Sequence, residues 1–401
     1  MGSDDPSSPQ PGVHPDILKL GLVSFLTDLS SEIIFSVFAI FFTTVAGASA
    51  ALLGLIEGLA DLSASSLNYL SGWLSDRSGK RKIFTIAGYG FSTLAKIILL
   101  VSSSVTGLAV FRVIERLGKS FRGPPRDAWL SAVAAQGNRG YAFGVHKALD
   151  KSGAVLGPLL AYALLSWLGE GMATYQVLFW VAMVPAVLSI GVLAMVEDKP
   201  GKPHERENLF ATWGTLSPAF KRYLVSSGIF SLAYFSFSFL LLRAYSVGFA
   251  VKDIVLLYAL FNIACVVTAP LIGKISDRVG RARMIMLGYL TYMLMCLGFA
   301  VATTQAEIIA LFVMFGVFYA IDEAQSKAFI ADLEQDRRAS AMGMYNFVTG
   351  MLYLPASLVA GALWLLHPAA AFLLAAALAL VALAVFLRLR PDRDLRIVSG
   401  H

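Results

Sequence analysis

Apolar residues fall in long runs along the whole chain, and short polar connections separate most of these runs. A helix needs about 20 such residues to cross a bilayer. The runs predict twelve membrane-spanning helices, at residues 17–43, 51–74, 83–103, 106–123, 141–166, 174–195, 221–246, 253–273, 284–302, 306–326, 341–365 and 369–388. One long polar connection, after the sixth run, divides them into two sets of six. We therefore expect an all-α polytopic membrane protein with two pseudo-symmetric six-helix bundles.

The polar connections also set the expected domain boundaries. The two bundles should occupy residues 17–196 and 221–388, with a linker at 197–220 and tails at 1–16 and 389–401. The linker is rich in charge, Pro and Gly, which is typical of a segment without regular structure. The N-terminal tail is acidic and rich in Pro and Ser, and it lacks the basic start and cleavage site of a signal peptide.

The composition excludes a soluble enzyme. Of the 401 residues, 57% are apolar and only 14% are charged, whereas soluble domains carry about 25% charged residues. Cys265 and Cys296 lie inside apolar runs, which favours two small buried side chains. No Gly-rich nucleotide loop, hydrolase motif or zinc-ligand spacing is present. The sequence thus predicts no enzyme, no cofactor and no transition-metal site, although the acid-rich first two spans could bind a hard cation such as Na⁺.

The basic residues are distributed very unevenly between the two sides of the predicted membrane. Most of the 32 Lys and Arg residues lie in the tails, the linker and the connections on the same side, whereas Lys252 alone lies in the opposite connections. Basic connections stay in the cytoplasm. We therefore expect both termini in the cytoplasm and the protein in the inner (plasma) membrane. The same asymmetry explains the net charge of +6 without a nucleic-acid partner.

A motif after the second span recurs half a chain later, after the eighth. The two copies read GWLSDRSGKRK and GKISDRVGRAR, and the residues of the motif that they share include Gly72, Asp76, Arg77 and Gly79 in the first and Gly273, Asp277, Arg278 and Gly280 in the second. A shorter echo relates residues 139–144 to residues 338–343. Two matches at nearly one offset indicate a tandem repeat, an architecture of transporters that bind substrate between two halves.

With this motif in both halves and twelve spans, the sequence resembles the major facilitator superfamily over its whole length. The resemblance implies a transporter that works by alternating access. It also implies that the two motif loops gate the cytoplasmic side, with Asp76 facing the start of the eleventh span and Asp277 that of the fifth. Gly79 and Gly280 would allow the tight turns between helices.

Three further segments bear on the direction of transport. The run from Ser152 to Pro158 in the fifth span resembles part of the Gly-Pro motif of the superfamily's antiporters, which favours export, although Leu160 and Ala161 stand where glycines often follow. Residues 116–128 and 27–32 resemble segments of bacterial members that are described as efflux proteins. None of the three segments identifies a substrate.

Ionisable residues inside the spans are the main candidates for function, because a charge in the bilayer costs several kcal/mol. Several acids come in pairs one helical turn apart, and the fourth span carries a stripe of basic residues. We expect the proton-coupling residues to be Asp28, Glu32, Glu57, Asp61, Asp150 and Arg116. Asp28 and Asp61 are the leading proton carriers, and Arg116 is the partner that tunes them.

The candidate substrate residues come from both halves: Arg112, Lys119, His146 and Lys151 in the first, and Tyr234, Tyr345 and Asn346 in the second. The repeat aligns Tyr345 and Asn346 with His146 and Lys147. The second half has few charges in its spans and many aromatic residues, so we expect it to receive the apolar part of an amphipathic substrate.

Burial of a carboxyl group favours its protonated form, and a nearby guanidinium favours the ionised form. A motion that changes the distance between them therefore changes proton affinity, and we expect proton-coupled efflux of a small amphipathic or cationic solute. One alternative is proton- or sodium-coupled uptake of an anionic solute, with the basic residues as its ligands. Another is a membrane receptor or assembly subunit that has lost transport. The expected partners are the solute, protons or sodium ions, and the lipid bilayer, and the chain should act as a monomer.

Overall fold

The computed structural model describes residues 14–133, 139–198, 213–334 and 337–391. Within these ranges it leaves aside the side chains of Asp76, Asp277, residues 139–141 and residues 338–340. All of the regular structure in the described residues is helical.

The described residues form twelve long helical segments, here called rods, with six in each half. The expected fold is thus confirmed. The N-terminal half contains α1 (Pro15–Ile40), which continues into the π-helical turn η1 (Phe41–Val45), then α2 (Ala50–Ser78), α3 (Arg81–Val101), α4 (Val105–Val133), α5 (Arg139–Leu168) and α6 (Met172–Ala194). The C-terminal half contains the turn η2 (Trp213–Thr215), α8 (Pro218–Ala233), α9 (Ser238–Ser246), α10 (Val251–Val279), α11 (Arg281–Val301), α12 (Gln305–Leu333), α13 (Arg338–Leu366) and α14 (Pro368–Leu389). The two short helices α8 and α9 form one rod.

Within the described residues, 11 segments are long and apolar enough to cross a membrane, counting α8 with α9 as one. The rod that fails this test is α4. Its length is sufficient, but charged residues recur along it from Arg112 to Asp127. The protein is therefore a multi-pass membrane protein. One of its spanning helices, α4, is polar because it carries charged residues that contact neighbouring helices.

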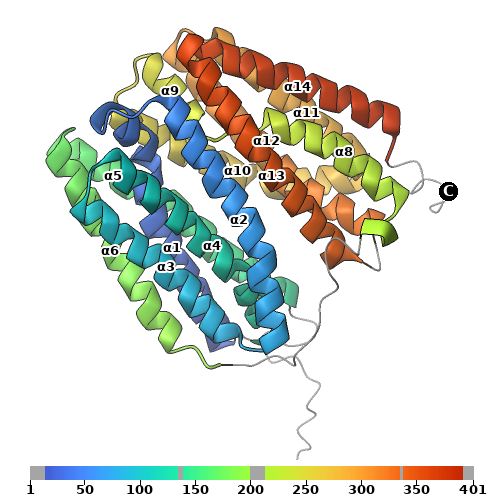
Figure 1. The fold of residues 1–401 in the computed structure, drawn as a ribbon, viewed down its shortest axis with the longest axis horizontal. Helices are drawn as coiled ribbons and strands as arrows, with labels where there is room; N and C mark the ends of the chain where they lie inside the picture. The colour runs from blue at the N-terminus through green and yellow to red at the C-terminus, as the bar shows by residue number, and fades with distance from the viewer. Residues whose placement is uncertain (1–13, 134–138, 199–212, 335–336, 392–401) are drawn as a thin grey trace, which may run out of the picture.

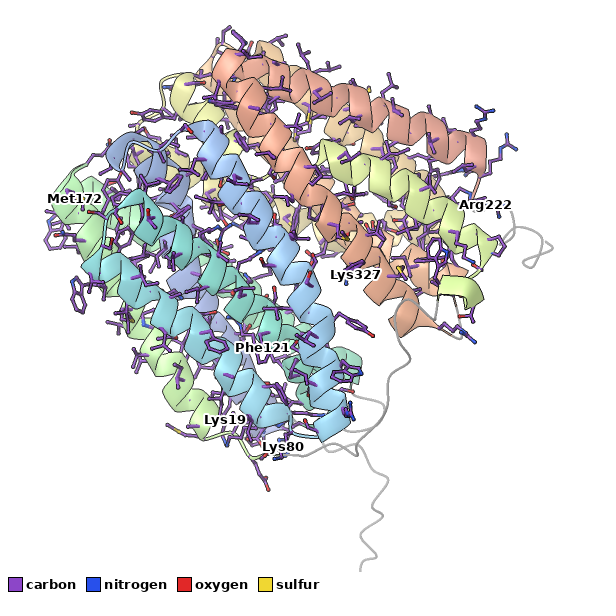
Figure 2. All side chains as sticks on the ribbon, in the orientation of Figure 1. Lys19, Lys80, Phe121, Met172, Arg222 and Lys327 are labelled. Atoms are coloured by element: carbon purple, nitrogen blue, oxygen red, sulfur yellow. The ribbon has the colours of Figure 1, made fainter. Side chains whose placement is uncertain are left out.

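The rods define two ends of the molecule. The linker end carries the turns at Gly79 and Gly280, where both glycines have positive φ, and the start of the connection between the halves. The far end carries the connections at residues 46–49, 169–171 and 247–250. Figure 2 shows Lys19 and Lys80 together at the linker end of the N-terminal half and Met172 at its far end.

Two rods differ from the expected spans. Helix α4 ends at Val133, well beyond the expected residue 123, and continues through Pro124 and Pro125. The expected span 221–246 is interrupted at Tyr234–Phe237 although the break contains no Gly or Pro. Hydroxyl groups replace the missing helical bonds there: Ser357 Oγ accepts from the amide of Ser236 at 3.2 Å, and the Tyr292 hydroxyl donates to the carbonyl of Ala233 at 2.8 Å.

The two halves touch closely at the far end and diverge toward the linker end (Figure 1). Helix α2 packs along α13, where Gly54 lies against the backbone of Ser357, and Gly361 against the backbone of Ala50. Glycine at these positions lets the two backbones approach. At the same end, the carboxylate of Glu170 accepts from the backbone amide of Lys252 at 3.4 Å.

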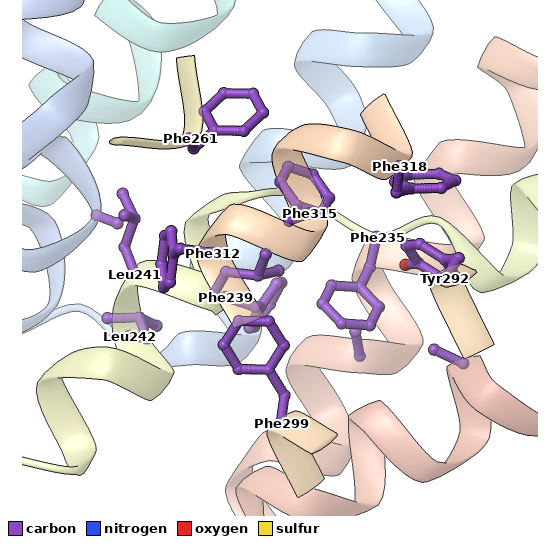
Figure 3. Packing of buried hydrophobic residues seen from close by; sticks show 14 of the residues in the cluster. Phe235, Phe239, Leu241, Leu242, Phe261, Tyr292, Phe299, Phe312, Phe315 and Phe318 are labelled. Atoms are coloured by element: carbon purple, nitrogen blue, oxygen red, sulfur yellow. The ribbon is translucent and has the colours of Figure 1, made fainter. Parts of the chain in front are cut away.

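The core of the C-terminal half is largely aromatic, as Figure 3 shows for rings from the break between α8 and α9 and from helices α9 to α12. Phe237 contacts Phe261 and Phe315 with ring centroids 5.0 and 5.2 Å apart. Phe299 contacts Phe312 at 5.7 Å. Edge-to-face and tilted pairs of this kind fill the bundle and hold its inner wall in a fixed shape.

Candidate functional site

A cavity of about 580 Å³ lies between the two halves, within the size range of small-molecule sites. Its lining comes from helices α1, α2, α4, α5, α9, α10, α12 and α13 and from the break between α8 and α9. The charged lining residues are Asp28, Glu32, Glu57, Asp61, Arg112, Arg116, Lys119, Arg122, Arg126, Lys147, Asp150, Lys151, Asp322 and Glu323. Its uncharged walls include Phe35, Tyr234, Phe237, Tyr258, Phe261, Phe315, Tyr319 and Tyr353.

On the N-terminal side of the cavity, α4 supplies basic partners for the two cavity acids of α2 and for one acid of α1. Arg112 binds both carboxylate oxygens of Glu57, at 2.8 and 2.6 Å. One helical turn along both helices, Arg116 binds Asp61 at 2.7 Å. The pairs form because 57 and 61 share the spacing of 112 and 116, so two residues on one face of α2 meet two on one face of α4.

The third acid, Asp28 of α1, is held differently. Its nearest basic partner is Lys119, at 3.7 Å, one further turn along α4. Asp28 is 6% exposed, so this carboxylate is nearly enclosed and weakly paired. Helices α1 and α4 also meet nearer the far end, where the Arg112 guanidinium lies 4.3 Å from the Phe35 ring centroid in a cation–π contact.

Two hydrogen bonds join the C-terminal half to acids of the N-terminal half, Glu32 and Glu57. The hydroxyl of Tyr258 on α10 donates to Glu32, and the hydroxyl of Ser238 at the start of α9 donates to Glu57 at 3.3 Å. Both acids are buried. The carboxylates of Glu32 and Glu57 therefore contact both halves, and a motion that parts the halves here removes their hydroxyl donors.

Nearer the linker end, α5 reaches α12 across the cavity. Lys147 binds Glu323 at 3.1 Å, and the Lys151 ammonium lies 5.6 Å from the Tyr319 ring centroid. The Lys147 side chain is 53% exposed, whereas Ser238 and Leu241 at the other end of the cavity are mostly covered. The cavity is thus open toward the linker end and closed at the far end.

Most of the residues expected from the sequence meet in this cavity. Ten of them line it: Asp28, Glu32, Glu57, Asp61, Asp150, Arg116, Arg112, Lys119, Lys151 and Tyr234. The exceptions are His146, Tyr345 and Asn346. His146 is buried inside the N-terminal bundle, Tyr345 stacks on Tyr223 inside the other bundle, and Asn346 is exposed away from the cavity.

Asp150 has local partners that the sequence does not reveal. Its carboxylate accepts from Ser24 on α1 at 2.5 Å and lies 3.9 Å from Lys147 on its own helix. Arg126 on α4 donates to the same serine hydroxyl at 3.4 Å. Arg126 lies beyond the expected end of the fourth span, which is why span counting excludes it from the site.

A buried charge behind the cavity is not among the residues expected from the sequence. Lys96 on α3 is 1% exposed and donates to Ser31 at 3.2 Å, and Ser31 donates to the fully buried Glu115 at 3.1 Å. Glu115 in turn lies 3.8 Å from Arg112. A single lysine in an otherwise apolar run is the signal that would have identified it.

The expected gating residues lie at the linker end of α2 and α10. Gly79 and Gly280 end these helices with φ of 68° and 94°. Both conformations favour glycine because a Cβ would be strained there. Gly72 and Arg77 lie in the last turns of α2, and Gly273 and Arg278 in those of α10. The side chains of Asp76 and Asp277 lie outside the described residues, so the contact expected with the other half stays a prediction.

The sequence model of the Major Facilitator Superfamily matches residues 20–251 and also residues 223–400. The chain belongs to the major facilitator superfamily. It is 34% identical to an uncharacterised MFS-type transporter of Methanocaldococcus jannaschii over 373 residues, which are 91% of this chain and 92% of that protein. As a superfamily member, the protein is a secondary transporter with a small-molecule substrate and is not an enzyme.

Two further matches are to proteins whose names give different transport functions. The crystal structure of the nucleoside transporter NupG matches with a TM-score of 0.75 at 13% identity, over 94% of this chain and 99% of that one. The multidrug resistance protein MdtH of Aeromonas hydrophila is 29% identical over 178 residues, 42% of this chain and 44% of its own length. At 13% identity, the NupG likeness establishes the superfamily fold alone.

Proposed function

We propose that this transporter exports a small amphipathic or cationic organic solute in exchange for protons. The observation that carries the proposal is the Asp61–Arg116 pair at 2.7 Å on the wall of a cavity between the two halves. The Asp61 carboxylate is neutralised either by the Arg116 guanidinium or by a proton. A change in the distance between Asp61 and Arg116 therefore changes how tightly the carboxyl group holds its proton. Asp28, nearly enclosed and weakly paired with Lys119, is the second carrier.

The remaining acids support these two carriers. Glu32 and Glu57 accept hydroxyl donors from the C-terminal half, and Asp150 accepts from Ser24. When the far end opens, Tyr258 and Ser238 withdraw and the ionised forms of Glu32 and Glu57 lose their donors. Proton uptake at these acids would therefore accompany opening of the far end, and proton release would accompany its closure.

The direction of export follows from the charge asymmetry. The excess of Lys and Arg at the linker end is typical of the cytoplasmic side, so both termini would be cytoplasmic and the protein would lie in the inner membrane. The cavity would then be open to the cytoplasm, ready to take up a solute for export. The partial similarity to the multidrug resistance protein MdtH favours the same direction.

Uptake of an anionic solute is the second candidate, because basic residues of α4 and α5 line the cavity. The contacts of those residues count against it. Arg112 and Arg116 already bind carboxylates of α2, and Lys147 binds Glu323, so an anion would have to displace an internal partner at each. An anion symporter would lose most of its activity on Arg116→Lys, since a bidentate anion contact does not tolerate that exchange.

The proposal is tested in proteoliposomes that contain the full chain and a pH-sensitive dye. A thermal-shift screen of organic cations first identifies a solute that stabilises the protein. Addition of that solute should move protons in the wild type and should not in the variant Asp28→Asn with Asp61→Asn. Asp253→Asn, an acid at the far end that does not line the cavity, is the matched control and should behave as wild type. Proton movement that survives the double substitution would refute the assignment of the carriers.

A further inference from the structure

Helix α12 presents a mixed aromatic and acidic face to the cavity. Phe315, Tyr319 and Asp322 are spaced at i, i+4 and i+7, which places them on one side of a helix, and Glu323 lies next to them. All four line the cavity. This face belongs to the C-terminal half, opposite the acids and arginines that the proton mechanism uses.

Two rings from other elements extend this face. Tyr234, in the break between α8 and α9, and Tyr353 on α13 line the same cavity, and their ring centroids lie 5.5 Å apart. Tyr234 is the C-cap of α8, where its amide still donates to the carbonyl of Phe230 at 3.1 Å, and its side chain lines the cavity at the point where the helix ends. We call Tyr234, Tyr319, Asp322, Glu323 and Tyr353 the C-half wall.

Asp322 is the acid of this wall without a basic partner. Its polar contact in the described part of the chain is Ser326 on its own helix, at 3.4 Å, and no ion pair to it forms there. By contrast, Asp61, Glu57 and Asp28 each have a basic residue of α4. An unpaired carboxylate beside aromatic faces in a cavity suits a bulky organic cation, because the carboxylate neutralises the charge and the rings bind its alkyl groups.

The structure already places ammonium groups against this wall. The Lys151 ammonium lies 5.6 Å from the Tyr319 ring centroid, and Lys147 binds Glu323 at 3.1 Å. Both lysines come from α5, in the other half. They show that the wall accepts ammonium groups that approach from the cavity, and that a ligand cation at the same place would have to displace them.

We propose that the C-half wall binds a substituted ammonium group of the exported solute and that Lys147 and Lys151 are internal cations that compete for the same place. This inference rests on the proposed export of a cation and names its binding site. It reverses the role expected for Lys151 from the sequence, since a competing lysine weakens substrate binding where a substrate ligand would strengthen it.

The test is calorimetric titration of the purified full chain with benzyltrimethylammonium, with benzyl alcohol as the uncharged comparison. Asp322→Asn should weaken binding of the cation about tenfold, equivalent to 1.4 kcal/mol. Lys151→Met, which keeps the length of the side chain and removes its charge, should tighten binding severalfold. Tyr319→Phe, which keeps the ring, should bind more tightly than Tyr319→Leu.

Three results would overturn the inference: wild-type protein that binds the cation no better than benzyl alcohol, unchanged affinity in Asp322→Asn, or weaker binding in Lys151→Met. Thermal unfolding of each variant shows whether it is folded, and the opposite signs expected for Asp322→Asn and Lys151→Met exclude general damage as the cause. Binding is measured without a proton gradient, so its failure is distinct from failure of proton exchange at Asp28 and Asp61.

Discussion

The close approach of α2 and α13 makes the closed far end sensitive to one methyl group. A Cβ on Gly54 would lie 2.2 Å from the backbone oxygen of Ser357, where ordinary contact begins at 3.4 Å. The backbones of the two helices would have to part by roughly an ångström, and such overpacking costs about 1–3 kcal/mol. Gly54→Ala should therefore shift the protein away from the far-end-closed conformation by about 5- to 150-fold.

The shift is measured with a reporter cysteine at Leu241, a covered residue of the cavity lining. The native Cys265 and Cys296 are replaced by alanine in all variants. A membrane-impermeant maleimide, added from the far side of the membrane, should label the reporter at least about fivefold faster in Gly54→Ala than in the parent. Alanine is also the better helix former by about 1 kcal/mol, so the helix itself is not weakened.

Gly90 on α3 provides the matched control, since a Cβ there has no neighbour within 4 Å. In Gly90→Ala, the reporter cysteine should be labelled at the same rate as in the parent. If the reporter is labelled equally slowly in Gly54→Ala and Gly90→Ala, the α2–α13 contact does not hold the far end closed, and the reasoning is refuted.

Three further perturbations test other parts of the account. Lys96→Met removes the buried ammonium that donates to Ser31, so the free energy of unfolding should fall by about 1–3 kcal/mol; wild-type stability would contradict this. Tyr258→Phe removes the hydroxyl that donates to Glu32, and a hydrogen bond to a charged group contributes about 1.5–3 kcal/mol. Far-side labelling of the reporter should therefore be faster in this variant. An unchanged labelling rate would speak against a bond between the halves there. Asp76→Asn should increase labelling of a cavity cysteine from the linker side, and unchanged labelling would count against the latch.

The sequence predicts the fold well because bilayer-length apolar runs and a repeated motif constrain the topology strongly. It also predicts Arg116 beside Asp61, and the structure brings these two residues together. The sequence does not predict the pairing of Arg112 with Glu57, since Arg112 is expected instead as a substrate ligand. It does not predict that Asp28 lies nearest Lys119, since that depends on the tilt of α1 against α4.

The repeat does not indicate which residues line the cavity. His146 and Tyr345 are equivalent in the two halves, and each packs into its own bundle away from the cavity. A repeat relates two positions to each other without saying which way either faces. The break at Tyr234 was hidden for another reason: the serines and the tyrosine hydroxyl that stabilise it lie partly on α11 and α13, far away in the sequence.

The central claim is that solute leaves in exchange for protons, and the direction of coupled proton movement tests it most directly. Proteoliposomes of defined orientation are loaded with a stabilising organic cation, and internal pH is followed while the solute flows down its own gradient. The account predicts proton movement opposite to the solute, which disappears in Asp28→Asn with Asp61→Asn. Proton movement in the same direction as the solute would establish symport, and solute movement without protons would contradict coupling through the cavity acids.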